Sequence, residues 1–400
     1  MLGNRRYDPR SGPFVDLLER AGLSTAVWEM SPFGDYNIPR HTRSFLVQPH
    51  LIALRAASQV LPQKDDRVEL EGFQEFVRRA SAAGLRFRHA DANRLSRDML
   101  YLSLLADRFS GWLRATRPRL GFVANVGLAE QAFCVACRGL GITSVEVQHG
   151  VQGDLHPTYG SWSALPRTGW EVRARVFWCW DEESAAAINR WAAHAPGYHE
   201  AIVGGDPWRE MWLDSENPIT RAAKRLVGER KQLIGGEKHI LVTLTSQGEA
   251  IPADVLEAVR GSPAGWRYWF RLHPVDQASR APVARRALLQ VNGDPELLDF
   301  ATEAPLYALL PHMDCHLSVA LSTVLREAAA QGLPSVACGV EAAVFYPQEV
   351  ASGLLLVAAG DGLVPALRQA LDRGRRSATL EPPSAPRAMT RLLSGLPRGT

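Results

Sequence analysis

The sequence predicts an α/β protein built from two parallel β-sheets, each covered by helices. Short apolar runs alternate with longer amphipathic stretches along most of the 400 residues. Strands that alternate with helices pair in parallel, because the crossover between them needs a helix. A chain of this length exceeds what one hydrophobic core usually serves, so we expect two domains. With 46% apolar and 22% charged residues, the composition is that of a globular protein.

The first half of the chain contains one complete series of alternating elements. Strand patterns rich in β-branched and aromatic residues occur at 25–29, 120–124, 143–148, 175–180 and 201–204. Helical patterns with an apolar residue every three or four positions occur at 44–60, 71–83, 92–116, 128–140 and 181–193. This series predicts one sheet with its crossover helices.

The second half repeats the alternation more regularly. Strands are expected at 239–244, 266–272, 297–301, 315–319, 335–338 and 354–357. Helices are expected near 253–260, 281–290, 306–311, 323–330, 345–350 and 364–373. Two such series imply two Rossmann-like domains.

The boundary between the domains is expected in a charged segment. We assign residues 1–212 to an N-terminal domain and 239–385 to a C-terminal domain, joined by a linker at 213–238. Asn217-Pro218 and Gly235-Gly236 punctuate that linker. A proline-rich stretch at 381–387 leads into a tail at 386–400 with a last short helix at 388–393.

Charge and cysteine content narrow the function classes. Forty-five basic against forty-two acidic residues leave a net charge of +3, too small for a nucleic-acid binder. Five cysteines without a regular framework favour a reduced, cytoplasmic chain. Cys134 and Cys137 have CxxC spacing, but they lie in an apolar helical pattern, which favours core packing over a redox or zinc site. The N-terminus lacks the apolar segment of a signal peptide, and no run reaches the roughly 18 apolar residues of a membrane span.

Arginines are concentrated in one region. Ten arginines and only three aspartates lie between residues 78 and 119. Clustered arginine attracts an anionic membrane surface, so we consider a peripheral contact at the inner face of the membrane. A solvated helix face is the alternative.

The first candidate site follows the strand at 143–148. In open parallel sheets, ligands bind at the carboxyl ends of the strands. His149 stands at such an end, where a neutral imidazole can take a proton and a charged one can hold a phosphate. Asp154 and His156 in the same loop could share either role. The alternative is that Gly150 and Gly153 make a turn that His149 only caps.

A second candidate site follows the strand at 266–272. The sequence there reads Arg271-Leu272-His273-Pro274, and Pro274 favours an extended conformation at His273. The planar guanidinium of Arg271 suits phosphate oxygens. A strand-end turn with an exposed arginine is the alternative.

Two further loops contain small polar residues at strand ends. Ser322 and Thr323 open a predicted helix, where free N–H groups attract phosphate, and Glu327 follows one turn later. A carboxylate there could bind sugar hydroxyls, or it could be an ordinary surface glutamate. Ser246 and Gln247 follow the strand at 239–244, and they suit either a ligand or a plain turn.

Several common motifs are absent from the sequence. The chain has neither a phosphate loop of the GxxxxGK[ST] kind nor a GxGxxG motif, which argues against an NTPase and a dinucleotide oxidoreductase. It also has no Asp-x-Asp pair for a divalent ion. We therefore expect no metal and no bound cofactor.

Three short motifs in order resemble a known group of enzymes. QHG in the first domain, RLHP in the second and STVLREAAAQGLP further on resemble bacterial surface-polysaccharide transferases of the GT-B fold. The group includes capsule and lipopolysaccharide glycosyltransferases such as the Kdo transferases, the polysialyltransferases and the teichoic-acid glycerophosphotransferases. The resemblance covers roughly residues 120–340. Thr323 and Gln148 depart from it, because the polysialyltransferases have a second serine and the glycerophosphotransferases a tryptophan at those places.

The resemblance implies two Rossmann-like domains facing a central cleft, and transfer from a nucleotide sugar such as a CMP-Kdo-like donor. The acceptor would be a glycan or a lipid-linked glycan of O-antigen or capsule synthesis. His149 would act as general base or phosphate ligand. A retaining reaction would instead need a carboxylate, for which the candidates are Glu146, Asp154 and Asp206. Donor contacts are expected at Arg271, His273, Ser322, Thr323, Glu327, Ser246 and Gln247, and acceptor-side contacts at Gln148, His156 and Tyr159.

Three alternatives stay open at this point. A CDP-polyol phosphotransferase of teichoic-acid type would use the same fold with another donor. A non-catalytic protein could bind a nucleotide or glycan as part of a biosynthetic complex. A nucleotide-sugar epimerase would act with no acceptor present.

Overall fold

The computed structural model describes residues 7–30, 42–61, 72–85, 92–156, 158–160, 165, 167–246, 248–274, 277–291, 293–377 and 384–395. The chain divides into two compact units. The N-terminal unit comprises 8–37, 42–206 and 384–400, and the C-terminal unit comprises 207–383 with the short stretches 1–7 and 38–41.

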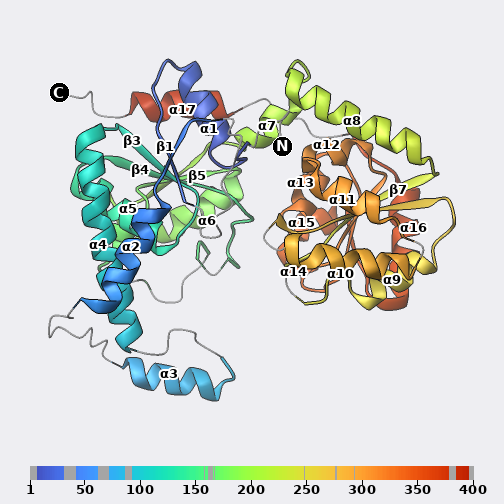
Figure 1. Cartoon of the computed structure of the whole chain (residues 1–400), viewed down its shortest axis with the longest axis horizontal. Coiled ribbons are helices and arrows are strands. Elements are labelled where there is room, and N and C mark those ends of the chain that lie inside the picture. The colour runs from blue at the N-terminus through green and yellow to red at the C-terminus, as the bar shows by residue number, and fades with distance from the viewer. Residues whose placement is uncertain are drawn as a thin grey trace. The chain divides into compact units, whose positions relative to one another are not determined.

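The N-terminal unit contains a four-stranded parallel sheet with the strand order β3-β4-β5-β6 (Figure 1). A separate parallel pair joins β1 to β2. The strands are β1 Val27–Glu29, β2 Ser44–Leu46, β3 Leu120–Val123, β4 Thr143–Val147, β5 Val176–Cys179 and β6 Glu200–Val203. The helices are α1 Gly12–Arg20, α2 Gln48–Val60, α3 Phe73–Ala82, α4 Ala92–Thr116, α5 Leu128–Gly139, α6 Glu182–Ala192 and α17 Ala385–Ser394.

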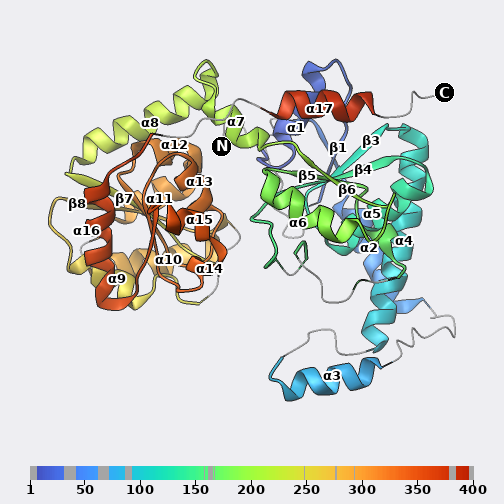
Figure 2. The same ribbon diagram turned by 180° about the vertical axis from the view of Figure 1, so that it is seen from behind.

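Both faces of this sheet are buried, which explains its nearly continuous apolar strands. Val145 of β4 and Trp178 of β5 face one side, where they pack with Phe14 of α1 and Met389 of α17. Phe177 faces the other side, in a cluster with Trp191 of α6 and with Tyr159 and Trp170. The last helix of the chain therefore covers the first sheet, and α17 lies beside α1 in both ribbon views (Figures 1 and 2).

The C-terminal unit contains a five-stranded parallel sheet with the order β11-β10-β9-β7-β8. The strands are β7 Lys238–Thr243, β8 Trp266–Arg271, β9 Cys315–Ser318, β10 Ser335–Ala337 and β11 Leu355–Val357. Apolar side chains alternate along β7, so that Ile240 and Val242 enter one core cluster and Leu241 enters the cluster on the opposite face. The helices are α7 Pro207–Leu213, α8 Pro218–Ile234, α9 Ala253–Arg260, α10 Gln277–Leu289, α11 Pro295–Glu303, α12 Leu306–Leu309, α13 Val324–Ala330, α14 Ala342–Phe345, α15 Pro347–Ala351 and α16 Leu363–Arg373.

The two parallel sheets confirm the predicted α/β class, and three segments differ from expectation. Residues 297–301 were expected as a strand but lie in α11, because Asp294 accepts hydrogen bonds from the N–H groups of Glu296 and Leu297 and Pro295 occupies the first turn. Residues 44–60 were expected as one helix but form β2 and then α2. Residues 213–238, expected as a linker, hold α8, which packs in the C-terminal unit.

Cys134 and Cys137 lie on α5, where both thiols are free and buried. Burial is the main cause that raises the pKa of each thiol. Their interpretation as core residues is confirmed. Among the helices that the structure describes, none is both long and apolar enough to cross a membrane.

Candidate sites at the carboxyl edges of the two sheets

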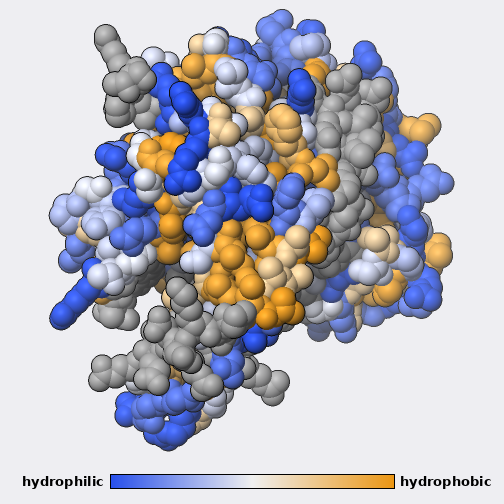
Figure 3. Space-filling model, turned by 60° about the vertical axis from the view of Figure 1, so that its left-hand side comes forward, coloured by the Kyte–Doolittle hydropathy of each residue, from blue (hydrophilic) through white to orange (hydrophobic). Residues whose placement is uncertain are grey.

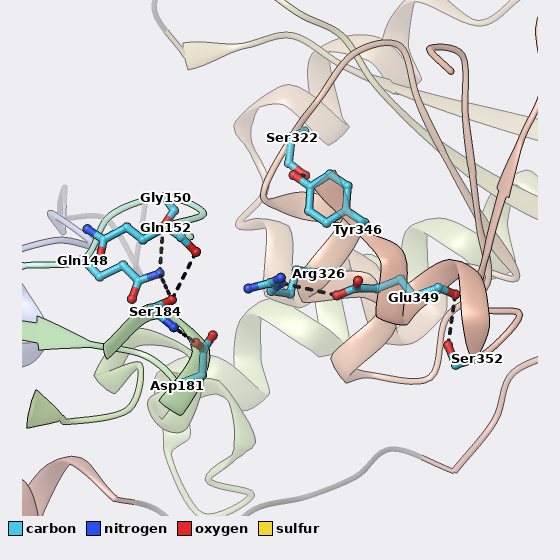
Figure 4. A network of polar contacts seen from close by, with 10 residues as sticks. All are labelled: Gln148, Gly150, Gln152, Asp181, Ser184, Ser322, Arg326, Tyr346, Glu349 and Ser352. Atoms are coloured by element: carbon cyan, nitrogen blue, oxygen red, sulfur yellow. Dashed lines mark hydrogen bonds and ion pairs between the residues drawn. The ribbon is translucent and has the colours of Figure 1, made fainter. Parts of the chain in front are cut away.

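The loop after β4 is held in place by the side chain of Gln148. Its Nε2 donates to the carbonyl oxygen of Gly150 at 2.9 Å and to Oγ of Ser184 at 3.2 Å, and its Oε1 accepts from the N–H of Trp180 at 2.7 Å. Asp181 caps α6 by accepting from the N–H of Ser184 (Figure 4). Gln148 was expected to contact an acceptor, but it is 5% exposed and its hydrogen bonds join its own loop to the end of β5 and the first turn of α6.

His149 follows at the carboxyl edge of β4, as expected. The residue is partly exposed, its Nδ1 is buried, and a hydrogen bond to the backbone of Val147 favours the charged ring. Burial lowers the pKa of His149, and the positive charge of Arg10 lowers it further. The imidazole is therefore neutral at pH 7 and has the form that a general base requires.

A buried carboxyl group lies one residue before this edge. Glu146 is 2% exposed and accepts a hydrogen bond from the phenol of Tyr159. Burial raises the pKa of Glu146 to about 7, although the charge of Arg173 and the Tyr159 hydrogen bond oppose the rise. Tyr159 is itself 2% exposed, so both residues form part of the interior.

Arg173 completes this cluster, although it belongs to no motif that would single it out. Its guanidinium carbon lies 5.2 Å from the centre of the Tyr159 ring and 5.5 Å from that of Phe177. Its Nε and Nη2 are buried and have no partner among the described groups. Glu146, Tyr159 and Arg173 thus place an acid, a phenol and a cation behind the loop that carries His149.

The other two polar residues of the loop lie in different surroundings. The ring of His156 packs against Tyr159 with centroids 4.8 Å apart, and its Nδ1 accepts from the N–H of Thr158. Burial lowers the pKa of His156, as does the charge of Arg173. Asp154 is exposed and forms an ion pair with Arg190 on α6. Of the three predicted catalytic residues, Glu146 belongs to this cluster, His149 follows the strand end, and Asp154 is held by a surface ion pair.

In the C-terminal unit, Arg271 holds the chain's own backbone. Its Nη1 donates to the carbonyl oxygens of Ala301 and Ala304 at 2.5 Å and to that of Thr302 at 3.2 Å. These carbonyls lie at the end of α11, where a helix leaves carbonyl groups without intrahelical partners. Burial lowers the pKa of Arg271 to about 10, and the charge of Glu327 opposes this. The guanidinium expected to contact phosphate thus has one nitrogen engaged by carbonyl groups.

The residues after β9 lie on a short loop before α13. Oγ of Ser322 accepts from the N–H of Val324 at 3.3 Å, and the carbonyl of Ser322 accepts from the phenol of Tyr346 at 2.8 Å. Thr323 precedes α13 without a side-chain cap, and Glu327 follows one turn later with its charge near Arg271. The structure therefore brings Glu327 and Arg271 together, two residues that the sequence had assigned to separate motifs.

An ion pair between Arg326 and Glu349 was not expected from the sequence. Nε of Arg326 on α13 lies 3.3 Å from Oε1 of Glu349 on α15, and the two side chains are 19% and 10% exposed (Figure 4). Tyr346 and Ser352 extend this set of polar contacts. The pair fixes the start of α13, and only tertiary structure brings its members together.

The loop after β7 is held by Arg280 of α10. Its Nη1 donates to the carbonyl of Thr245 at 2.7 Å and its Nη2 donates to that of Gly248. Ser246 is partly exposed between these two anchors, whereas Gln247 lies outside the described residues. His273 is exposed after β8, so its ring stands at the carboxyl edge as expected.

The described residues contain no group of three or more His, Cys, Asp or Glu side chains that could hold a metal ion. The expectation that the protein needs no metal stays a prediction.

Solved structures resemble this architecture over its whole length. UDP-GlcNAc 2-epimerase from Methanocaldococcus jannaschii matches with a TM-score of 0.55 and 13% identity, covering 97% of this chain and 96% of that one. UDP-GlcNAc 2-epimerase from Neisseria meningitidis, bound to UDP-GlcNAc, matches with a TM-score of 0.52 and 14% identity, covering 86% and 97%. Wall teichoic acid polymerase TagF matches with a TM-score of 0.40 and 12% identity, covering 63% of this chain and 67% of that one. No protein-family model and no curated protein matches the chain. The chain has a fold of the GT-B type, with two Rossmann-like units.

Proposed function

We propose that this protein is a nucleotide-sugar-utilising enzyme, and specifically a glycosyltransferase of bacterial surface-polysaccharide synthesis. The observation that carries the proposal is the placement of His149 and His273, each directly after a strand at the carboxyl edge of its own parallel sheet. The GT-B type of fold supports it, since two of the solved structures that share it are UDP-GlcNAc 2-epimerases, one of them bound to UDP-GlcNAc.

In this proposal, the C-terminal unit holds the donor. His273 contacts the donor phosphates together with the backbone and hydroxyl groups of the loops at Ser246 and Ser322. Arg271 keeps α11 in place beneath His273, and its neighbour Glu327 binds a donor hydroxyl. The negative charge that develops on the leaving nucleotide is stabilised by the backbone N–H and hydroxyl groups of these loops and by the imidazole of His273.

In the N-terminal unit, His149 takes the proton from the acceptor hydroxyl. Its neutral ring at the carboxyl edge of β4 supports this role, because a base must hold a free lone pair near the operating pH. Glu146 and Tyr159 act from behind the loop and do not touch the acceptor. Glu146 as a nucleophile receives no support from its burial, so we propose direct transfer with His149 as the base.

The test is a thermal-shift screen of the full chain against CMP, CDP, UDP, GDP and ADP. A nucleotide at 100 times its Kd should stabilise the protein by about 2.7 kcal/mol through mass action. The His273→Ala variant should lose that stabilisation, and His149→Ala should keep it while losing transfer. The control is His194→Ala, because His194 is exposed after α6, away from the carboxyl ends of the strands. The proposal fails if no nucleotide stabilises the protein, or if His273→Ala behaves like the control.

A nucleotide-sugar 2-epimerase is the second candidate, and the full-length likeness to two epimerases favours it. Incubation of the protein with the donor that the screen identifies, with no acceptor present, separates the two activities. An epimerase converts the donor to its epimer under these conditions. A transferase leaves the sugar configuration unchanged and consumes the donor only when an acceptor glycan is added. Transfer of glycerol phosphate from CDP-glycerol to an added acceptor, with release of CMP, would indicate the phosphotransferase instead.

We further propose that the N-terminal unit meets an anionic membrane surface, as synthesis on a lipid-linked acceptor requires. The outward side of α2, here called the α2 face, is apolar over three turns. Ile52 is 59% exposed and Val60 is 81% exposed, and Phe45 of β2 is 53% exposed. In Figure 3, orange side chains gather in the middle of the face that carries α2. The α2 face comprises Pro49, Ile52, Ala53, Ala56 and Val60.

Arginines outnumber acidic residues in the segments that form α2 and the helices after it. Within the described ranges between 42 and 119 there are ten arginines and three acidic residues. Arg97 donates to the carbonyls of Ser58 and Gln59 at the end of α2, and Arg94 precedes it by one turn on α4. Apolar side chains in segments rich in arginine are complementary to the headgroup region of an anionic bilayer.

The membrane contact is tested by co-sedimentation with phosphatidylglycerol and phosphatidylcholine vesicles. Each arginine near the surface contributes about 1 kcal/mol, so reversing Arg43 and Arg94 to glutamate should weaken binding at least about tenfold. Ile52→Glu should weaken it as well. The control is Leu233→Glu, which changes a leucine of similar exposure (79%) on α8 of the other unit. Equal binding to neutral vesicles, or equal loss in the control, would refute the contact.

A further inference from the structure

A chain of buried polar groups crosses three strands of the C-terminal sheet. Nε2 of His316 lies 2.9 Å from Oγ1 of Thr243, and its Nδ1 lies 3.1 Å from Oγ of Ser335. Oγ1 of Thr243 lies 3.4 Å from Oγ of Ser318, and that hydroxyl lies 2.7 Å from the carbonyl oxygen of Ala320. The four side chains point to one face of the sheet, since Thr243 pairs with Ser318 and His316 pairs with Ser335 across the strands.

Burial requires that these groups satisfy one another. His316 and Ser318 are fully buried, Ser335 is 2% exposed and Thr243 is 7% exposed. Burial lowers the pKa of His316 to about 3, so the ring is neutral and carries a single N–H. A buried donor without an acceptor is costly, so the protons should be arranged to leave none.

The direction of donation along these hydrogen bonds follows from the last group, the carbonyl of Ala320. The carbonyl of Ala320 can only accept, so the hydroxyl of Ser318 donates to it. Ser318 then accepts from Thr243, and the only proton of the Thr243 hydroxyl is used. Thr243 must therefore accept from His316, which places the ring proton on Nε2. Nδ1 of His316 carries a lone pair and accepts from Ser335.

We propose that His316 is a positioning residue, whose Nε2–H acts through two hydroxyl groups to fix the carbonyl of Ala320 and the loop at 319–323. This inference rests on the proposed function, in which that loop presents Ser322 to the donor. The loop is exposed at Leu321, 39% of whose side chain is accessible, so an internal anchor is needed to hold it. His316 itself lies two residues below the strand end and does not touch the donor.

Because these hydrogen bonds run in one direction, the hydroxyl groups on the two sides of His316 have different effects on Ala320. Thr243→Val and Ser318→Ala both break the path to Ala320, whereas Ser335→Ala removes the same kind of group from the far side and leaves that path intact. Ser335→Ala is therefore the matched control. Thr243→Ser keeps the hydroxyl and should restore the behaviour of the original chain if Thr243→Val folds poorly.

The first measurement is the tautomer of His316 by ¹⁵N NMR on the full chain without nucleotide. The original chain, Thr243→Ser and Ser335→Ala should all show Nε2–H. In Thr243→Val the proton should move to Nδ1, where Ser335 can accept it. A ring protonated at Nδ1 in the original chain would overturn the proposal.

The second measurement is amide hydrogen exchange at Val324 and Leu325, whose N–H groups bond to Ser322. Exchange there should accelerate in Thr243→Val and Ser318→Ala and stay unchanged in Ser335→Ala. If amide exchange accelerates equally in all three variants, the hydrogen-bonded groups around His316 only support the core, and the positioning role is overturned.

The third measurement is nucleotide affinity by calorimetry. Kd should rise about tenfold in Thr243→Val and Ser318→Ala, which corresponds to about 1.4 kcal/mol, and change less than about twofold in Ser335→Ala. Unchanged affinity with accelerated exchange would overturn the link to the donor. If no nucleotide binds the original chain, the proposed function fails, while the tautomer and exchange results still decide whether His316 positions the loop.

Discussion

Replacing Glu146 by glutamine should stabilise the protein above pH 7 and change little below pH 5. The carboxyl group is buried, and burial raises its pKa from 4.5 to about 7. Between these two pH values the folded protein holds a proton that the unfolded chain has released, so the free energy of unfolding falls as pH rises. This decrease in the free energy of unfolding is complete above pH 7.

The size of this loss follows from the two pKa values. A pKa raised from 4.5 to about 7 costs about 3 kcal/mol of folding free energy once the group is ionised in both states. Glutamine has nearly the shape of the protonated acid and still accepts the hydrogen bond from Tyr159. The variant should therefore equal the original chain within about 1 kcal/mol at pH 4.5 and exceed it by about 3 kcal/mol at pH 8.5.

Other groups titrate in the same range with the opposite sign. Burial lowers the pKa of His199 and of His239 to about 4, so their contribution to stability is present above pH 6.5 and lost as pH falls towards 4. The pH dependence of the original chain alone mixes the two effects. Subtracting the curve of the variant removes the histidine contributions, since they are common to both proteins.

The assay is urea denaturation of both proteins at half-unit steps from pH 4.5 to 8.5. The control is Asp154→Asn in the same loop, because an exposed ion pair such as Asp154 with Arg190 contributes only about 0–1 kcal/mol. A difference between the original chain and Glu146→Gln that stays constant over this range would refute the reasoning. It would mean that Glu146 ionises at the same pH in the folded and unfolded states.

Further changes test the packing around the two sites. Arg326→Leu should cost about 3 kcal/mol by leaving Glu349 buried without its partner, and adding Glu349→Leu should recover most of the loss in urea denaturation. Gln148→Ala should cost about 2 kcal/mol and speed amide exchange in its loop. Gly204→Ala should destabilise the protein by about 3 kcal/mol or more, because a Cβ at this position would lie 2.0 Å from the indole ring of Trp178. The control is Gly139→Ala, which has open space at the end of α5. It should lower the melting temperature by less than about 1 °C or raise it.

Much of the fold was predictable because its elements carry strong local patterns. The helix at Ala92–Thr116 was predicted with its observed bounds, since its apolar residues recur with helical period over seven turns. The segment at 297–301 was wrongly predicted as a strand, because a short run with four apolar residues among five suits a buried strand and a helix equally. Asp294-Pro295 before it was the signal that could have decided for a helix.

The sequence predicted where the site residues lie along the strands better than it predicted which groups surround their side chains. Strand ends place His149 and His273 at the sheet edges, and that much follows from pattern alone. Whether Arg271 faces a ligand or its own backbone depends on carbonyl groups about thirty positions away, and no local pattern records them. Arg173 and His316 likewise acquire their roles only from neighbours that tertiary structure supplies.

The place of α17 has a consequence for how the protein is made. Val145 and Trp178 are covered partly by Ala385 and Met389, which leave the ribosome more than two hundred residues later. A nascent chain that has completed its first sheet therefore keeps an uncovered apolar strip throughout synthesis of the second. A gene cut after residue 206 would yield an aggregation-prone fragment, and a separate peptide spanning 384–400 should restore its solubility when the two are expressed together.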